Sequence, residues 1–320
     1  MKSISDLQEI IEQELSNINI PKSPENLYKP INYVIGLGGK RIRPILVLIA
    51  HQLFGRDFKN ALAPALGIEI FHNFTLLHDD IMDNAHLRRG KKTVHEKWNN
   101  NVAILSGDTM LVQAYQLMTN VDSSLVQEVL NIFSQTSIKV CEGQQWDMDF
   151  ETKSDVSLSE YIKMIEYKTA VLLAASLQIG GITGGANTEQ QNHLYEFGRN
   201  LGIAFQLKDD LLDVFGSPDA FEKKVGGDIM ANKKTFLYLK ALQLADDVVK
   251  KQLQDHYTSE DSEGKISAVK GIFKNLDIEK HTVDMMKAYY TKAMKHLDAI
   301  DSDNKAPLIA FSEKLMDRIA

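Results

Sequence analysis

Apolar residues recur at helical spacing along almost the whole chain. Ile70, Phe74, Leu77 and Ile81 follow one another at intervals of three or four residues, and residues 201–215 carry a similar run. This spacing places the apolar side chains on one face of an α-helix. No segment alternates apolar and polar residues over a length typical of a strand. The pattern predicts an all-α fold, a bundle of about ten or more helices around a central cavity.

Glycine and proline interrupt the helical pattern at intervals. None of these breaks is a long Ser/Gly linker, so we expect one domain over residues 1–320. The breaks lie at residues 21–24, 36–39, around 90, at 180–185, 216–227 and 258–264.

Composition restricts the setting in which the protein acts. The net charge of -7 argues against a nucleic-acid-binding surface. Cys141 is the only cysteine, so no disulfide can form within the chain, and a cytoplasmic location is expected. We expect Cys141 to be a small buried apolar group. The apolar stretches 44–54 and 170–179 are too short to span a bilayer and indicate core helices, so no membrane span is expected.

Two short segments concentrate aspartates between apolar residues. "LLHDDIMD" covers residues 76–83 and "FQLKDDLLD" covers residues 205–213, and each has aspartates at positions i, i+1 and i+4. On a helix, such a triplet falls within an arc of about 100°. His72 lies seven residues before Asp79 on the same stripe, and Gln206 precedes Asp210 by one turn.

Like charges this close destabilise a helix and favour protonation of one another, unless a cation neutralises them. Carboxylate ligands without cysteine or paired histidine suit Mg²⁺, which keeps part of its water shell and bridges to phosphate. The alternative is a solvated acidic face. One triplet would fit that alternative, but two triplets of the same pattern, both embedded in apolar residues, favour metal binding.

Basic residues occur close to both triplets. "GGKRIRP" (residues 38–44) places Lys40, Arg41 and Arg43 at the start of an apolar helix, where glycines and the helix N-terminus favour an anion. The P-loop pattern is absent, which argues against an ATP site. Together with Mg²⁺, these cations indicate a site for diphosphates. The other candidates are Arg88, Arg89, Lys168, Lys224 and Lys233.

These motifs, in this order, resemble the trans-isoprenyl diphosphate synthases, also called polyprenyl synthetases, over nearly the full length. The matching stretches are GGKRIRP, His72 in FHNFTLLHDD, DDIMD, RRG, EGQ, YKTA, FQLKDDLLD and KVGGDI with NKK. The resemblance implies an all-α synthase fold, a homodimer and three Mg²⁺ ions per active site. The activity that it implies joins an allylic diphosphate to isopentenyl diphosphate, head to tail and in trans, with enzymes such as farnesyl and geranylgeranyl diphosphate synthase as the short-chain type.

The resemblance also implies roles for single residues. Mg²⁺ and the allylic diphosphate would be held by Asp79, Asp80 and Asp83, and Asp209 would complete the metal cluster with Asp210 and Asp213 in direct or water-mediated support. The allylic diphosphate would be contacted by Arg88, Lys168, Lys224 and Lys233. Isopentenyl diphosphate would be held by Lys40, Arg43, His72 and Arg89. The reacting carbons would be lined by Thr169 and Gln206, which with Lys168 form the catalytic set.

Product length is predicted from the residues before the first aspartate triplet. Phe74 and Thr75 lie five and four residues before Asp79, about 7.5 and 6 Å deeper along the helix. A large ring at position 74 would close the tunnel that receives the growing prenyl chain, as in short-chain relatives, so we expect a product of fifteen to twenty carbons, with twenty favoured. The alternative is that Phe74 only packs in the core.

Two other functions would also account for part of these motifs. A class I terpene cyclase also ionises a prenyl diphosphate with aspartate-bound Mg²⁺, but it needs no second diphosphate site such as GGKRIRP with His72 and Arg89. A non-catalytic subunit of a two-component synthase would tolerate broken aspartate triplets, and both triplets are intact here.

Overall fold

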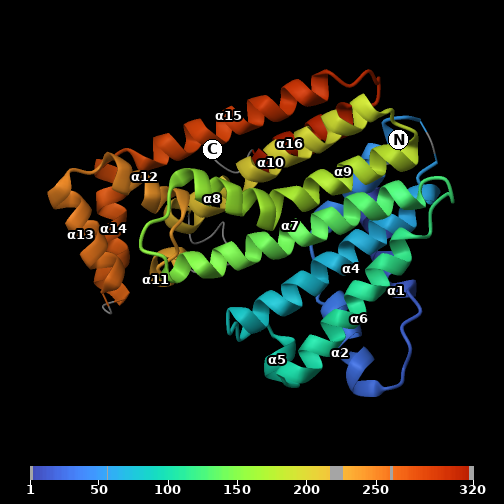
Figure 1. Ribbon diagram of the computed structural model, residues 1–320, viewed down its shortest axis with the longest axis horizontal. Coiled ribbons are helices and arrows are strands. Elements are labelled where there is room, and N and C mark those ends of the chain that lie inside the picture. The colour runs from blue at the N-terminus through green and yellow to red at the C-terminus, as the bar shows by residue number, and fades with distance from the viewer. Residues whose placement is uncertain (1–2, 56, 217–225, 260–261, 317–320) are drawn as a thin grey trace. The chain divides into compact units, whose positions relative to one another are not determined.

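The computed structural model describes residues 3–55, 57–216, 226–259 and 262–316 (Figure 1). The chain forms two compact units. Unit 1 comprises Met1–Gln135, Ala175–Leu194 and Asp301–Phe311, and unit 2 comprises Thr136–Ala174, Tyr195–Ile300 and Ser312–Ala320. The prediction of one domain over residues 1–320 stays a prediction.

Unit 1 is built around helix α4 (Lys59–Met82), which contacts every other helix of the N-terminal half. Figure 1 shows α6 running beside α4. The elements of this half are α1 (Ile4–Asn17), α2 (Glu25–Gly36), α3 (Ile42–Gln52), β1 (Leu87–Arg88), β2 (Lys91–Lys92), α5 (Val94–Lys97) and α6 (Asn100–Met118). The sequence sets the start of these helices through side-chain caps. Ser3 and Asp6 form a capping box at α1, and Asn99 accepts the N–H of Val102 at α6.

Unit 2 contains the second aspartate segment and a layer of C-terminal helices. These elements are α8 (Leu158–Ile165), the π-helix η1 (Glu166–Ala170), α11 (Gly227–Met230), α12 (Phe236–Leu244), α13 (Asp247–Thr258), α14 (Ser262–Asn275) and α15 (Ile278–Asp298). The boundary between the units falls within α7 (Val126–Thr152), α9 (Val171–Gly184), α10 (Thr188–Phe215) and α16 (Ala306–Met316).

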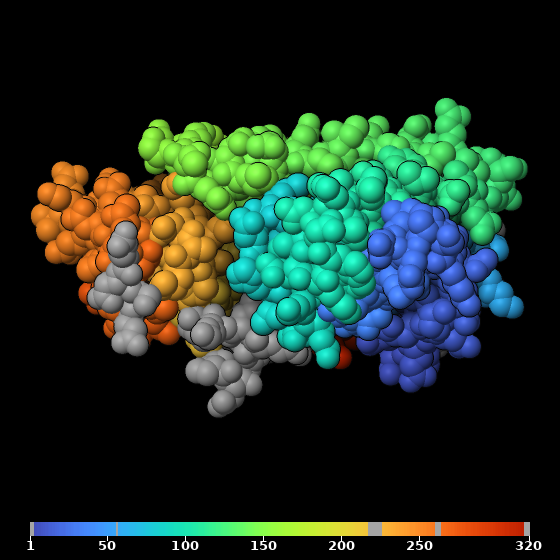
Figure 2. All heavy atoms as spheres, turned by 90° about the horizontal axis from the view of Figure 1, so that it is seen from below, coloured from blue at the N-terminus to red at the C-terminus, as the bar shows by residue number. Residues whose placement is uncertain are grey.

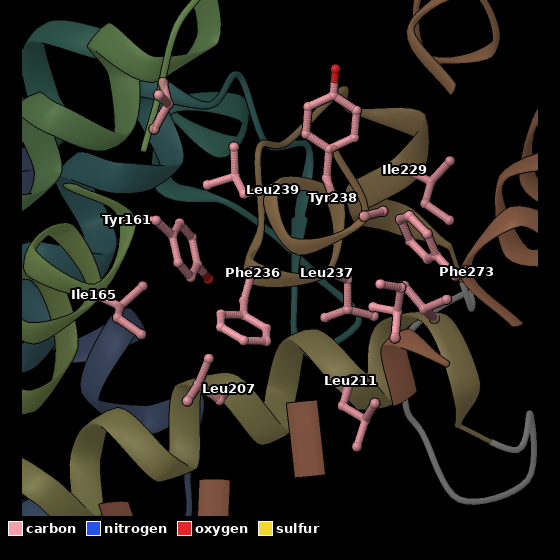
Figure 3. Close-up of a cluster of buried hydrophobic side chains, with 14 of the residues drawn as sticks. Tyr161, Ile165, Leu207, Leu211, Ile229, Phe236, Leu237, Tyr238, Leu239 and Phe273 are labelled. Atoms are coloured by element: carbon pink, nitrogen blue, oxygen red, sulfur yellow. The ribbon is translucent and has the colours of Figure 1, made fainter. Parts of the chain in front are cut away.

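The core of unit 2 fixes α10, the helix that carries the second aspartate segment. In Figure 3, Leu207 and Leu211 of α10 lie below the consecutive residues 236–239 of α12. Tyr161 and Ile165 of α8 and Phe273 of α14 belong to the same cluster of buried residues. Replacing one of its large side chains by alanine is expected to cost about 3–5 kcal/mol, so the position of α10 in this unit is strongly determined.

The all-α prediction is confirmed, and the helices of the described residues exceed ten in number. The core helices predicted at residues 44–54 and 170–179 are present as α3 and α9, both with buried side chains. Within the described ranges, no helix is long and apolar enough to cross a membrane.

Two local predictions differ from the structure. Cys141 is exposed on α7, so the expectation that it is buried is wrong, because position 141 falls on the outer stripe of an amphipathic helix. The chain also forms a two-stranded hairpin at residues 87–92, with Leu87 opposite Lys92 and Arg88 opposite Lys91. Strands of two residues are too short for the alternating pattern by which strands are predicted.

Candidate functional site

The first aspartate triplet lies at the C-terminal end of α4, as the helical spacing predicts. Asp79 is partly exposed, Asp80 is buried and Asp83, which caps the helix, is exposed. The N–H of Asp83 donates to the carbonyl of Asp79 at 2.8 Å, so one turn of helix separates these two side chains. The triplet therefore presents two accessible carboxylates and one enclosed carboxylate.

The buried carboxylate, Asp80, is bound by Arg88, which lies on the hairpin of residues 87–92. The hairpin turns at Arg89 and Gly90, both with positive φ (53° and 71°), as two-residue turns of this kind require. Arg88 then points back to α4, where its Nε lies 2.9 Å from each oxygen of Asp80 and its Nη2 lies 2.7 Å from Oδ1. The structure thus pairs Asp80, predicted as a metal ligand, with Arg88, predicted as a diphosphate contact.

A group of arginines surrounds His72 in unit 1. Arg43 Nη1 lies 3.1 Å from His72 Nε2. Burial, followed by the charges of Arg43, Arg89, Arg88 and Arg41, holds the pKa of His72 well below its ordinary value. The ring is therefore neutral at pH 7, and its Nε2 accepts the hydrogen bond from Arg43.

Arg43 itself has an unused donor. Burial lowers its pKa to about 10, so it remains protonated at neutral pH. Its buried Nε has no hydrogen-bond partner among the residues that the structure describes. Since buried donors are almost always satisfied, this atom indicates a missing acceptor such as a ligand oxygen.

The glycines of GGKRIRP allow Arg89 to approach this group. Gly38 and Gly39 have φ of 74° and 150°, and a Cβ on Gly39 would lie 2.8 Å from Arg89 Nη2. Lys40 follows directly and is exposed. The loop before α3 therefore joins Arg89 to the segment that carries Lys40 and Arg43, as the predicted site for isopentenyl diphosphate requires.

Arg41, the third cation of this motif, has a different role. Its side chain is 1% exposed and donates to Glu69 Oε1 at 2.7 Å, to Glu12 Oε1 at 2.8 Å and to the carbonyl of Ile35 at 2.9 Å. Asn73 Nδ2 also donates to Glu69 Oε1, at 3.0 Å. Arg41 thus ties α1, α2 and α4 together at the start of α3, a function that the motif alone did not indicate.

The second aspartate triplet, on α10 in unit 2, also divides into enclosed and accessible carboxylates. Asp209 is partly exposed, whereas Asp210 and Asp213 are buried. The N–H of Asp228 donates to Asp213 Oδ2 at 2.9 Å. Burial, and then the charge of Asp228, raise the pKa of Asp210 to about 8.

A chain of hydrogen bonds joins three predicted site residues to Asp210. Thr169 Oγ1 donates to Gln206 Oε1 at 3.1 Å, and Gln206 Nε2 donates to Asp210 Oδ1 at 3.1 Å. Tyr161, which the sequence did not indicate, donates its hydroxyl to Asp210 Oδ2. Thr169 and Gln206, both predicted to line the reacting carbons, are therefore brought together.

Two predicted site lysines, Lys168 and Lys233, contact an aspartate that was not predicted from the sequence. Asp147 Oδ2 lies 2.5 Å from Lys168 Nζ and 3.5 Å from Lys233 Nζ. Lys168 and Thr169 lie in η1, and π-helical turns are frequent at functional sites. A Cβ on Gly143 would lie 2.7 Å from Lys168 Cα, so η1 packs directly on the backbone of α7.

Four further residues belong to the predicted motifs or lie beside them. Gln144 of EGQ is buried, and its amide oxygen and nitrogen have no partner in the described part of the chain. Thr75 Oγ1 donates to the carbonyl of His72 at 2.8 Å, and Phe74 is 8% exposed. Lys224 lies outside the described residues.

The metal prediction can be compared with these positions. Within the described ranges, no three His, Cys, Asp or Glu side chains form a ready-made metal site. Since Mg²⁺ takes few protein carboxylates and keeps several waters, Asp83, which is exposed, and Asp79 and Asp209, which are partly exposed, are compatible with this ion. The two triplets lie in different units, so the prediction that they share one ion cluster stays a prediction.

Comparison with known proteins supports the resemblance seen in the motifs. The profile of the family described as Polyprenyl synthetase matches residues 24–276. A geranylgeranyl diphosphate synthase of Methanosarcina mazei is 42% identical over 222 residues, which are 69% of this chain and 68% of that protein. A short chain isoprenyl diphosphate synthase of Methanothermobacter thermautotrophicus is 35% identical over 312 residues, covering 97% of this chain and 94% of that one.

The fold is similar to solved structures as well. A crystal structure of a geranylgeranyl pyrophosphate synthase superposes with a TM-score of 0.95 at 42% identity, and the match covers 100% of both chains. The match to this solved structure covers the whole chain, and none of the similarities favours either of the two alternative functions considered above.

Proposed function

Because the chain belongs to the polyprenyl synthetase family, we propose that it joins isopentenyl diphosphate to an allylic diphosphate at the residues described above, and that its main product has twenty carbons. The protein is a prenyltransferase of the isoprenyl diphosphate synthase type. The observation that carries the residue assignment is the partly buried pair of Arg43 and His72, with Arg89 close by; His72 lies on α4, the helix that ends at the Asp79–Asp83 triplet. The cationic side chains would bind one diphosphate, and the carboxylates, together with Mg²⁺, would bind the other.

The site for isopentenyl diphosphate is assigned to Lys40, Arg43, His72 and Arg89. Arg43 offers its unused Nε–H, and Arg89 reaches the same loop over Gly39. The neutral ring of His72 positions Arg43 by accepting its Nη1–H. None of these four residues is a carboxylate, so this site binds its diphosphate by cationic side chains.

The allylic diphosphate is assigned to the two aspartate triplets, to Arg88, Lys168 and Lys233, and by resemblance to Lys224. We assign Mg²⁺, with three ions per site, to Asp79, Asp83 and Asp209, which are exposed or partly exposed. The buried Asp210 and Asp213 are second candidates that support them. Asp80 orients Arg88 through its bidentate contact. When bound, Mg²⁺ would help to neutralise the diphosphate leaving group.

The chain's own residues then favour carbon–carbon bond formation in three ways. Arg88 and Lys168 stabilise the charge that develops on the leaving diphosphate. We assign the oxygens of Thr169 and Gln206 to positions beside the allylic cation; Gln206 is held in place by its hydrogen bonds with Thr169 and Asp210. The apolar residues around Phe74 exclude water that would quench the cation. The proton lost at the end is assigned to the departing diphosphate, because no other base is indicated.

Chain length is assigned to Phe74 and Thr75. The ring of Phe74 is buried but retains 8% exposure, and Thr75 is partly exposed one residue further along α4. We propose that Phe74 forms the floor of the tunnel for the prenyl tail.

The experiment is to incubate the purified protein with Mg²⁺, isopentenyl diphosphate and dimethylallyl, geranyl or farnesyl diphosphate, and to size the products. The expected main product has twenty carbons, and Phe74→Ala should give longer products. Failure to elongate any primer would contradict the function, whereas an unchanged length in Phe74→Ala would contradict only the role of Phe74.

The homodimer implied by the family is part of the proposal. Helix α6 has exposed apolar side chains at Ile104 (43%), Leu105 (60%) and Val112 (59%). Figure 2 shows α6, in turquoise, open at the surface of unit 1 beside α2 in blue. A second copy covering this face would remove these side chains from water. Light scattering should give a dimer for the wild type and a monomer for Leu105→Glu/Val112→Glu; a monomeric wild type would contradict the proposal. The cytoplasmic location stays a prediction.

A further inference from the structure

His78, the residue before the first aspartate triplet, lies in a notch of the neighbouring helix. Its Nε2 is 3.3 Å from the carbonyl oxygen of Ile104 on α6. A Cβ added to Gly107 would lie 2.7 Å from His78 Cδ2. Carbon atoms in contact prefer about 3.5–4.0 Å, so only glycine at position 107 leaves room for this ring.

The same ring bears on Phe74. The two residues are one turn apart on α4, their ring centroids are 4.7 Å apart and the rings are inclined at 67°, a favourable edge-to-face contact. On its other side, Phe74 packs against Phe71, with a centroid distance of 5.6 Å. The ring of Phe74 is thus held between two aromatic neighbours on one face of α4.

These two neighbours differ in how firmly they are fixed. Phe71 is fully buried and packs against Phe133 of α7, at 5.1 Å and 76°. The side chain of His78 is 20% exposed, and its position depends on the notch at Gly107. His78 is therefore the neighbour through which the position of Phe74 can change without opening the core.

We infer that His78, seated in the notch at Gly107, is a positioning residue that fixes the ring of Phe74 and thereby sets the depth available to the prenyl tail. This inference rests on the proposed function, in which Phe74 is the floor of the tunnel. His78 would be a determinant of product specificity that acts through Phe74. The contrary account is that His78 only packs α4 against α6.

The two accounts predict different changes in the products. His78→Ala removes the ring that confines Phe74, so products longer than the wild type's should rise at least fivefold as a fraction of the total. His78→Asn, which keeps a donor near the Ile104 carbonyl but removes the ring, should do the same and serves if the alanine variant does not fold. If His78 only packs the helices, stability and overall rate would fall while the product ratio stayed constant.

Gly107→Ala tests the notch from the other helix. The added methyl group should push the His78 ring against Phe74 and shift the products toward shorter chains. In the His78→Ala background there is no ring to displace, so Gly107→Ala should then have no further effect on length. This non-additivity is the signature of a contact between the two residues.

Gly67→Ala is the matched control. Gly67 also lies on α4 and faces α6, where an added Cβ would be 2.9 Å from Met118 Cε, but it has no contact with Phe74 among those described. It should alter stability without altering product length. All variants are assayed with dimethylallyl and isopentenyl diphosphate, alongside Phe74→Ala, so that products shorter and longer than twenty carbons can both form.

The outcomes separate the inference from the proposed function. Longer products from Phe74→Ala together with a product ratio within twofold of the wild type in both His78 variants would overturn the role of His78 alone. An unchanged product in Phe74→Ala would overturn the floor assignment and, with it, this inference.

Discussion

Removal of Glu69 is expected to destabilise unit 1 strongly, because it leaves a buried arginine without its main counter-charge. Arg41 and Glu69 are 2.7 Å apart, and their side chains are 1% and 4% exposed. Asn73 occupies the same carboxylate oxygen. In Glu69→Leu, Arg41 keeps its charge in a site that excludes water, and breaking a buried pair in this way costs about 3–5 kcal/mol.

The second partner of Arg41 cannot replace Glu69. Glu12 is 42% exposed and makes two hydrogen bonds to the guanidinium, so it is only partly removed from water and compensates the loss of Glu69 only in part. Glu12→Gln keeps a hydrogen-bonding side chain and should therefore lower the free energy of unfolding by less than Glu69→Leu does. The double variant Arg41→Met/Glu69→Leu has no buried unpaired charge and should be more stable than Glu69→Leu alone.

Urea denaturation of the wild type, the two single variants at positions 41 and 69 and the double variant gives the coupling free energy. We expect a strongly non-additive result. A cost below about 1 kcal/mol for Glu69→Leu, or a double variant that costs the sum of the single variants, would refute this account of the pair.

Three further predictions follow from the site. Arg88→Lys removes the bidentate contact with Asp80 and should lower kcat/KM for the allylic diphosphate by about tenfold or more; kinetics equal to the wild type would show that this geometry is not needed. Gly143→Ala places a methyl group against the backbone of Lys168, and circular dichroism with an activity assay should show a folded protein of much reduced rate; full activity would contradict the packing of η1. Because the pKa of His72 is held well below its ordinary value, unfolding takes up a proton as pH falls below about 6.5, so stability is lost on acidification. In His72→Gln, urea unfolding between about pH 7.5 and 5.5 should show a flatter decline, and a slope equal to that of the wild type would contradict burial of a neutral ring.

The helices and the chemistry of the site could be predicted because both depend on the spacing of residues that are close in the sequence. The apolar spacing of Ile70, Phe74, Leu77 and Ile81 falls within α4, and the helical arc of the first triplet agrees with its position at the end of that helix. These features depend on residues within one or two turns of each other, which is the range over which a sequence pattern is reliable.

The pairing of individual charges could not be predicted. Lys40, Arg41 and Arg43 are equivalent in the motif, yet Arg41 turns inward because Glu69 and Glu12, from distant segments, meet it there. In the same way, Arg88 binds Asp80 because a hairpin too short to be recognised reverses the chain. Asp147 was missed because no acidic residue directly follows it, so that it does not form an i, i+1, i+4 triplet, although Glu151 lies four residues further on.

The most direct test of the account is equilibrium binding of isopentenyl diphosphate in Mg²⁺-free buffer, measured by titration calorimetry on the wild type, Arg43→Gln and Arg88→Gln. If isopentenyl diphosphate binds at Lys40, Arg43, His72 and Arg89, Arg43→Gln should lose charge-assisted hydrogen bonds worth about 1.5–3 kcal/mol, which corresponds to a fall in affinity of about 10- to 150-fold. Arg88→Gln should stay within about twofold of the wild type, because Arg88 serves the other diphosphate. Equal losses in both variants, or a loss only in Arg88→Gln, would contradict the assignment of two separate diphosphate sites.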